Sequence, residues 1–274
     1  MTVSASHKQE LVTQIQKMTL MDDIFFNNFM DNNPEAMEYI LNIIMERNDL
    51  HVVRLQTQHG IPNIYGRSVR FDVFATDQNG SEYNFEVQNA NHGADPKRAR
   101  YNSSMMDYQH LSAGQNFSDL PQTYVIFITA RDVLGHNLPI YHIRRYISEL
   151  ALPFLDNTNI IYVNGETNDN SPLGMLMQDF KQADAHKMKS KILASRMNYL
   201  KSTNEEVTKM SQIVEEYAAK RVAEAKLEGK LEGKLIGIAE TMKNIMKNNN
   251  WSAEKALTFM GIPQNEQFQY LKFI

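Results

Sequence analysis

The sequence has no cysteine among its 274 residues. Disulfide bonds and thiolate metal sites are therefore excluded, and folding does not depend on an oxidising compartment. The chain also lacks any run approaching the roughly 18 consecutive apolar residues of a membrane-spanning helix. Its polar N-terminal segment has no apolar core of the signal-peptide type. These absences predict a cytoplasmic protein that does not act at a membrane.

An excess of positive charge is also missing. Lysine and arginine number 28 against 32 aspartates and glutamates, for a formal net charge of −4. This balance argues against a uniformly basic, nucleic-acid-coating surface. It does not exclude a nuclease, because an acidic metal site adds negative charge that bound cations offset. The chain has no glycine-rich phosphate loop or dinucleotide-binding fingerprint, which argues against nucleotide-dependent enzymes.

The length and the change in composition along the chain predict one substantial domain with appendages. Residues 185–248 contain no proline and are rich in Lys, Glu, Ala and Met, which is typical of long helices. A KLEG-KLEG-KLIG repeat at residues 226–237 places three glycines there, each costing about 1 kcal/mol in a helix relative to alanine. The repeat is either a flexible connector or a glycine-lined helix pair. We predict a domain at 1–180, a helical extension at 181–249 and a small helical cap at 250–274.

Asx-Pro pairs predict where two helices of the main domain begin. Asn33-Pro34 precedes a stripe of apolar residues at helical spacing. Asp95-Pro96 opens a predicted helix at residues 97–114, whose first turn carries Lys97, Arg98 and Arg100. Cations at a helix N-terminus oppose the macrodipole, so their position favours a functional use. A continuous apolar run at residues 124–130 predicts a central strand.

Residues 67–88 show the period-two alternation of a β-hairpin. A two-residue Asn79-Gly80 loop would mix apolar and polar faces, whereas a three-residue loop at 78–80 with Gly80 left-handed keeps both faces uniform. The second register places Asp72 opposite Glu86, and Arg70 opposite Gln88. Opposed Cβ atoms lie about 4.5–5.5 Å apart, so the two carboxylates repel unless one is protonated or a cation lies between them. The alternative is two solvated carboxylates on an exposed strand face.

These residues carry a resemblance to a known family. The quoted segments are MDDIFF, GRSVRFD, YNFEVQ, KRARYNSSMMD, YVIFIT, LPIYHI and IIYVNG. Together, over residues 19–180, they resemble the PD-(D/E)XK nuclease superfamily, and more narrowly its recombination-promoting nuclease/putative transposase group. The resemblance implies an α/β, restriction-endonuclease-like core, a mixed sheet flanked by helices, with a C-terminal helical extension.

The resemblance also implies a magnesium or manganese site. Asp72, Glu86 and the Val87 backbone carbonyl would be the metal ligands, and all-oxygen ligation suits these hard cations. Gln88 stands where the superfamily usually has lysine, and it would help position water. As catalytic residues we therefore predict Asp72, Glu86 and Gln88.

Further residues of the predicted site have competing interpretations. Asp22 or Asp23 could supply an auxiliary acid on the first helix, and Asp22 is the better match because it fits the family's D-x-x-F spacing. N-terminal helix capping is at least as good an explanation for these two acids. Lys97 could supply the missing cation, while Arg98 and Arg100 could project into the site or bind DNA. The alternative for these three is ordinary solvated helix charge.

The functional prediction is a magnesium-dependent DNA endonuclease. One alternative is a weak or inactive nuclease fold that binds DNA or protein, and another is RNA cleavage. A homo-oligomer formed through the C-terminal helices is also predicted.

Overall fold

The computed structural model describes residues 5–63, 66–89, 93–111 and 114–271. The chain forms two compact units, Met1–Ile213 and Val214–Ile274. The helices are α1 Ala5–Lys17, α2 Asp23–Met30, α3 Pro34–Ile44, α4 Pro96–Tyr108, α5 Pro172–Phe180, α6 Lys191–Ser202, α7 Asn204–Asn249, α8 Ala253–Phe259 and α9 Gln264–Leu271. The strands are β1 Val52–Ile61, β2 Val69–Asp77, β3 Glu82–Gln88, β4 Thr123–Thr129, β5 Ile140–Ile143, β6 Tyr146–Ile147, β7 Leu152–Pro153 and β8 Thr158–Asn164.

A six-stranded mixed sheet in the order β1-β2-β3-β4-β8-β5 organises the first unit. Strands β1, β2 and β3 are antiparallel, as predicted, whereas β3, β4 and β8 are parallel. Parallel neighbours require a crossover, and α4 provides it between β3 and β4. Every residue of β4 is buried, which confirms the prediction of a central strand covered on both faces.

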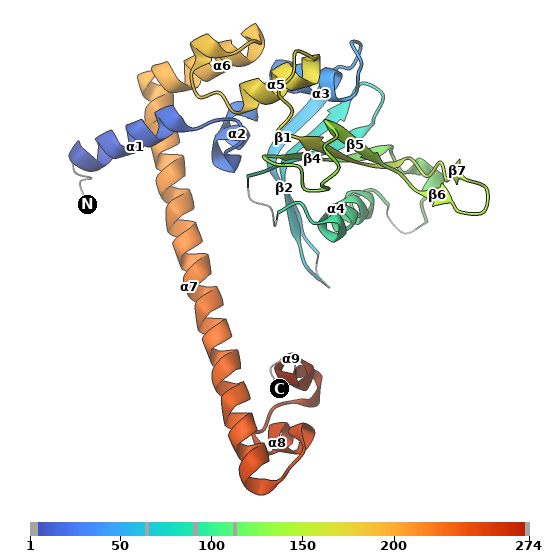
Figure 1. Ribbon diagram of the computed structural model, residues 1–274, viewed down its shortest axis with the longest axis vertical. Helices are drawn as coiled ribbons and strands as arrows, with labels where there is room; N and C mark the ends of the chain where they lie inside the picture. Colours follow the sequence, from blue (N-terminus) through green and yellow to red (C-terminus); the bar gives the residue numbers. More distant parts are fainter. Residues whose placement is uncertain (1–4, 64–65, 90–92, 112–113, 272–274) are drawn as a thin grey trace. The chain divides into compact units, whose positions relative to one another are not determined.

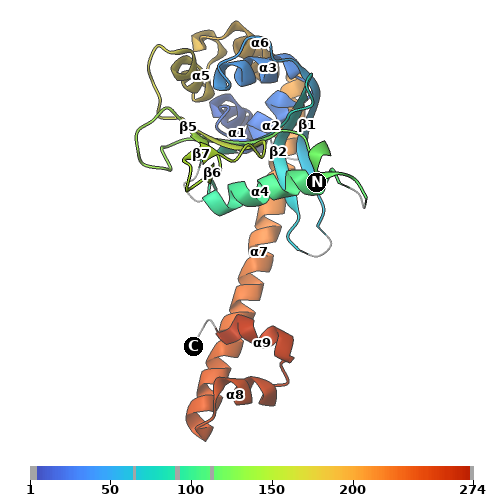
Figure 2. The same cartoon turned by 90° about the vertical axis from the view of Figure 1, so that its right-hand side faces the viewer.

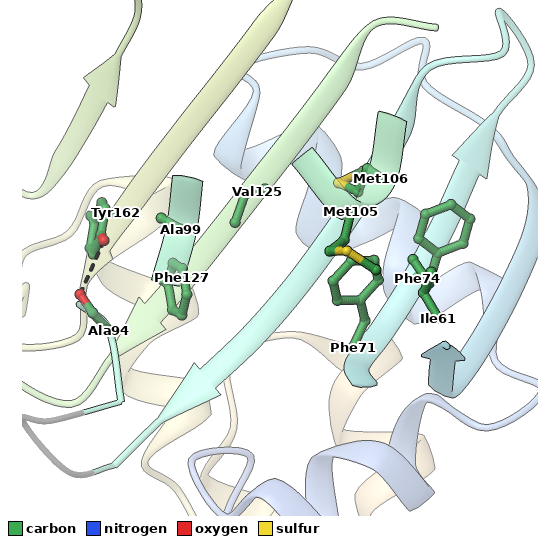
Figure 3. Close-up of a cluster of buried hydrophobic side chains, with 10 residues drawn as sticks. All are labelled: Ile61, Phe71, Phe74, Ala94, Ala99, Met105, Met106, Val125, Phe127 and Tyr162. Atoms are coloured by element: carbon green, nitrogen blue, oxygen red, sulfur yellow. Dashed lines mark hydrogen bonds between the residues drawn. The ribbon is translucent and has the colours of Figure 1, made fainter. Parts of the chain in front are cut away.

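Helices cover both faces of this sheet (Figures 1 and 2). Helices α2 and α3 lie on one face with α1, α5 and α6 beside them, and α4 lies alone on the other. The core under α4 contains ten buried residues from the strands and from α4 with its preceding loop (Figure 3). They are Ile61, Phe71, Phe74, Ala94, Ala99, Met105, Met106, Val125, Phe127 and Tyr162. The predicted restriction-endonuclease-like α/β core is confirmed.

Capping fixes the helix starts as predicted. The Asn33 side chain accepts a hydrogen bond from the Ala36 N–H at the start of α3, and Asp95 accepts one from the Lys97 N–H at the start of α4. The end of α4 differs from the prediction, because the helix stops at Tyr108 rather than near residue 114. The sequence offered Gly114 as the stop, but Gln109 already ends the helix as its C-cap.

The KLEG repeats lie within α7, which is helical throughout Asn204–Asn249. The segment is thus a helix rather than a non-helical connector. A Cβ added at Gly229, Gly233 or Gly237 would meet no atom of the described chain within 4 Å. A glycine-lined contact between two chains stays a prediction.

The second unit ends in two short helices, α8 and α9, as the sequence predicts. Ser252 caps α8 by accepting a hydrogen bond from the Lys255 N–H, and Gly261 makes the turn with φ of 73°. Met242, Ala256, Leu257 and Tyr270 form the unit's buried cluster. None of the helices in the described ranges combines the length and apolar character needed to cross a membrane.

Candidate active site

The β2–β3 hairpin has the predicted register. Val73 pairs with Phe85 and Thr76 with Glu82, and the Asp77 N–H donates to the Ser81 carbonyl at 3.0 Å. Gly80 has φ of 81°, as a three-residue loop requires. Continuing this register by one residue places Asp72 beside Glu86.

The two strands separate just beyond that point. Paired positions end at Val73 and Phe85, although β2 begins at Val69 and β3 ends at Gln88. The predicted pairing of Arg70 with Gln88 is therefore not part of the ladder. At the fork, the Val87 N–H donates to Asp72 Oδ2 at 3.3 Å. This bond draws the Asp72 carboxylate between the strands, toward Glu86.

Both carboxylates are shielded from solvent. Glu86 has 0% of its surface exposed, and Asp72 is only partly exposed. The alternative of two solvated carboxylates on an open face is wrong, because α4 covers this face at Glu86. Burial and, to a smaller extent, the nearby Asp72 charge together raise the pKa of Glu86 to about 8, against the opposing effect of Arg98. Burial likewise raises the pKa of Asp72 to about 6, against the pull of Arg98.

The first two turns of α4 surround Glu86 with donors. Arg98 Nη2 forms an ion pair with Glu86 Oε2, and Asn102 Nδ2 donates to Glu86 Oε1 at 3.3 Å. Arg98 Nη1 donates to the Gly93 carbonyl at 2.8 Å, and its guanidinium lies 5.7 Å from the Phe127 ring centroid. The cation that opposes the helix macrodipole is thus held by a buried acid.

Other predicted residues are placed differently around this pair. Gln88 reaches Glu86 with Nε2, at 3.5 Å from Oε2. Lys97 and Arg100 are solvent-exposed on α4. Asp22 accepts hydrogen bonds from the Thr19 N–H at 2.8 Å and from Thr19 Oγ1 at 3.2 Å.

Two residues of the site, Asn102 and Gly93, were not identified from the sequence, whereas Asp23 was considered there together with Asp22. The charge of Asp23, on α2, raises the pKa of Asp72. Asn102 follows Arg98 at the i, i+4 spacing that shares a helix face, and this spacing could have indicated it. Gly93 accommodates the Gln88 side chain, which only the three-dimensional arrangement reveals.

The donor set fits a hard divalent cation. Asp72 and Glu86 contribute carboxylate oxygens, and the Val87 backbone adjoins them at the fork. Oxygen ligands of this kind suit magnesium and manganese. When both carboxylates are ionised, their charge exceeds that of Arg98, and a bound cation would balance the remainder. In the part of the chain that the structure describes, no group of three or more His, Asp or Glu side chains forms a metal-binding cluster.

Comparison with protein families identifies the family of the chain. The model of the PD-(D/E)XK nuclease family transposase matches residues 25–228. The chain belongs to this family. The match confirms the resemblance seen in the sequence. It includes the hairpin and α4 but begins after Asp22 and Asp23. Neither the curated proteins nor the solved structures yielded a match.

Proposed function

We propose that this PD-(D/E)XK nuclease family transposase is a divalent-metal-dependent DNA endonuclease that hydrolyses phosphodiester bonds. The observation that carries the proposal is the Asp72–Glu86 carboxylate pair at the fork of β2 and β3, in which Glu86 is fully buried and Asp72 partly exposed. Two carboxylates held side by side repel each other unless one is protonated or a cation compensates for their charge. Membership of a nuclease family favours a bound cation that takes part in phosphodiester hydrolysis.

Asp72, Glu86 and the Val87 carbonyl are the proposed ligands of magnesium or manganese. Bound there, the cation would polarise the scissile phosphate and lower the pKa of an attacking water. Asp72 is held in place by the Val87 N–H, and Glu86 by Asn102. These hydrogen bonds orient the carboxylates in advance.

Gln88 and Arg98 together take the place of the lysine expected in this superfamily. The Gln88 amide can position a water molecule but carries no charge. Arg98 brings a permanent positive charge to the same carboxylate, and its side chain is 40% exposed, so the guanidinium can also face a phosphate. Arg100 and Lys97, exposed nearby on α4, would hold the DNA backbone.

A second candidate function is a nuclease fold that binds DNA or protein without cleaving it. The specific observation in its favour is the Arg98–Glu86 ion pair, which engages an oxygen that the metal would need. For cleavage, Arg98 must release Glu86 when the cation binds. Titration calorimetry with manganese separates the two functions, because an active site binds manganese and loses that binding on Glu86→Gln.

The direct test is incubation of supercoiled plasmid with the protein and magnesium or manganese. Nicking by the wild type, its loss on addition of EDTA, and its loss in Asp72→Asn are expected. Asp95→Asn is the matched control, since this exposed acid caps α4 outside the carboxylate pair. Absence of nicking by the wild type, or equal nicking by Asp72→Asn, would contradict the endonuclease proposal.

A further inference from the structure

A small two-stranded sheet extends from the edge of the main one. Residues 144–156, here called the arm, follow edge strand β5 and contain β6 and β7, which pair only with each other among the described strands. Figure 1 shows β6 and β7 projecting beyond the end of the main sheet. An isolated two-stranded hairpin is marginally stable in water, so we expect the arm to be stabilised by packing against a partner.

The surface of the arm is apolar. Its large exposed apolar side chains are Tyr146, Leu150, Leu152, Phe154 and Leu155. Leu155 is 87% exposed and Leu150 62% exposed. Five such side chains within ten residues favour an interaction surface, whereas single exposed apolar residues do not. Ala151 and Leu155 also have positive φ, of 51° and 26°, a conformation that is uncommon for side-chain-bearing residues.

The arm lies at the opposite end of the sheet from the carboxylate pair. Ile143, the last residue of β5, pairs with Ile160 near the start of β8. Strands β8, β4 and β3 run parallel, and their first paired residues are in register. Glu86 is near the end of β3, so the arm extends from the other end. We therefore do not expect the arm to bind the substrate that the carboxylate pair would hold.

The charges of the arm point to a protein rather than a nucleic acid. It carries two arginines and two acids, Arg144, Arg145, Glu149 and Asp156, which sum to zero. Nucleic-acid surfaces require a positive excess. Arg145 Nη1 forms an ion pair with Asp156 Oδ2 at 2.5 Å. Arg144 and Glu149, both exposed, remain as one charge of each sign.

We propose that the arm binds the same arm of a second copy of this chain. The outer edge of β6 is open in the two-stranded sheet, and an antiparallel β6–β6 pair would extend it across a two-fold axis. With that axis between Tyr146 and Ile147, the turn at 148–151, which follows β6 and carries Glu149, lies at the same end of the pair as Arg144 of the other chain. The surface is thus complementary to itself in charge, as a two-fold interface requires.

Light scattering on the full chain over a range of concentrations tests this proposal. The wild type is expected to be a dimer, and Leu152→Ser with Leu155→Ser to be monomeric. Both residues are exposed, so the fold survives their replacement. The matched control is Phe268→Ser on α9, also an exposed apolar residue, which is expected to stay dimeric. Loss of the dimer in the control alone would assign association to the C-terminal helices and overturn the proposal.

Charge reversal tests the pairing itself. Arg144→Glu and Glu149→Arg are each expected to weaken the dimer about tenfold or more, and the double variant to restore it. Because the chain has no cysteine, Ser148→Cys with a short bismaleimide should give a cross-linked dimer, and Ser104→Cys on the outer side of α4 should not. A monomeric wild type, or a double variant as weak as the single ones, would overturn the proposal. The proposal would also be overturned if the wild type were monomeric and the arm variants lowered its DNA affinity.

Discussion

The side-chain amide of Gln88 occupies the space that a side chain at Gly93 would need. An ideal Cβ at Gly93 would lie 1.6 Å from Gln88 Oε1. The same glycine accepts a hydrogen bond from Arg98 through its carbonyl. The loop before α4 thus packs closely against both residues that we propose in place of the missing lysine.

Gly93→Ala should therefore reduce activity without unfolding the protein. The clashing atom is the far end of a flexible side chain, so Gln88 can move away at little cost in stability. Losing one positioned hydrogen-bonding group costs about 1 kcal/mol, which predicts a nicking rate lower by about fivefold to tenfold. Gly60→Ala is the control, since a Cβ there meets no described atom within 4 Å. Equal nicking rates in the two variants would contradict a role for Gln88.

Arg98→Ala should lower the nicking rate by about 100-fold or more, as expected when a charge-stabilising group is lost. If Arg98 supplies the charge that Gln88 lacks, Gln88→Lys should partly restore activity to Arg98→Ala. Arg100→Ala removes an exposed cation from the same helix and should mainly weaken DNA binding, with a smaller salt dependence. An Arg98→Ala protein that Gln88→Lys leaves equally inactive would show that the two positions do not share one role.

Asp22 and Asp23 should behave differently on replacement by asparagine. Asp22 accepts two hydrogen bonds from Thr19, so Asp22→Asn should lower the free energy of unfolding by about 1 kcal/mol and leave manganese affinity unchanged. Asp23 acts on Asp72 electrostatically, so Asp23→Asn should change manganese affinity more than stability. Thermal unfolding and calorimetry measure the two effects. The reverse pattern would favour the auxiliary role that D-x-x-F spacing suggested for Asp22.

Local rules explain what the sequence revealed about the fold. Asn33-Pro34 and Asp95-Pro96 fix helix starts through short-range hydrogen bonds, and Gly80 fixes the hairpin loop, which in turn sets the register of Asp72 and Glu86. These features depend on residues close in sequence, so a single sequence shows them.

Long-range packing explains what the sequence did not reveal. Glu86 is buried because α4 crosses over β3, and no pattern within the strand distinguishes it from a solvated glutamate. That the charge of Asp23, rather than that of Asp22, acts on Asp72 depends on how α2 packs against the sheet. The exposure of the arm likewise depends on tertiary packing, because residue type alone does not tell whether Leu152 and Leu155 are buried or exposed.

The carboxylate pair predicts an unusual pH dependence of stability in the absence of divalent metal. Burial raises the pKa of Glu86 to about 8 and that of Asp72 to about 6, both above their ordinary values. Between these ordinary values and the raised ones, the folded state keeps protons that the unfolded state releases. The free energy of unfolding must then fall as pH rises.

Thermal unfolding in EDTA should show this fall in stability between about pH 5 and about pH 8. Glu86→Gln removes the ionisable group that contributes most, so its curve should be flatter and its stability at the higher pH should exceed that of the wild type. Glu10→Gln, at an exposed position on α1, should follow the wild-type curve. Stability that rises with pH equally in all three proteins would mean that Glu86 is ionised in the folded state and fully neutralised by Arg98. In that event only Asp72 of the pair would carry a charge that Arg98 leaves unbalanced.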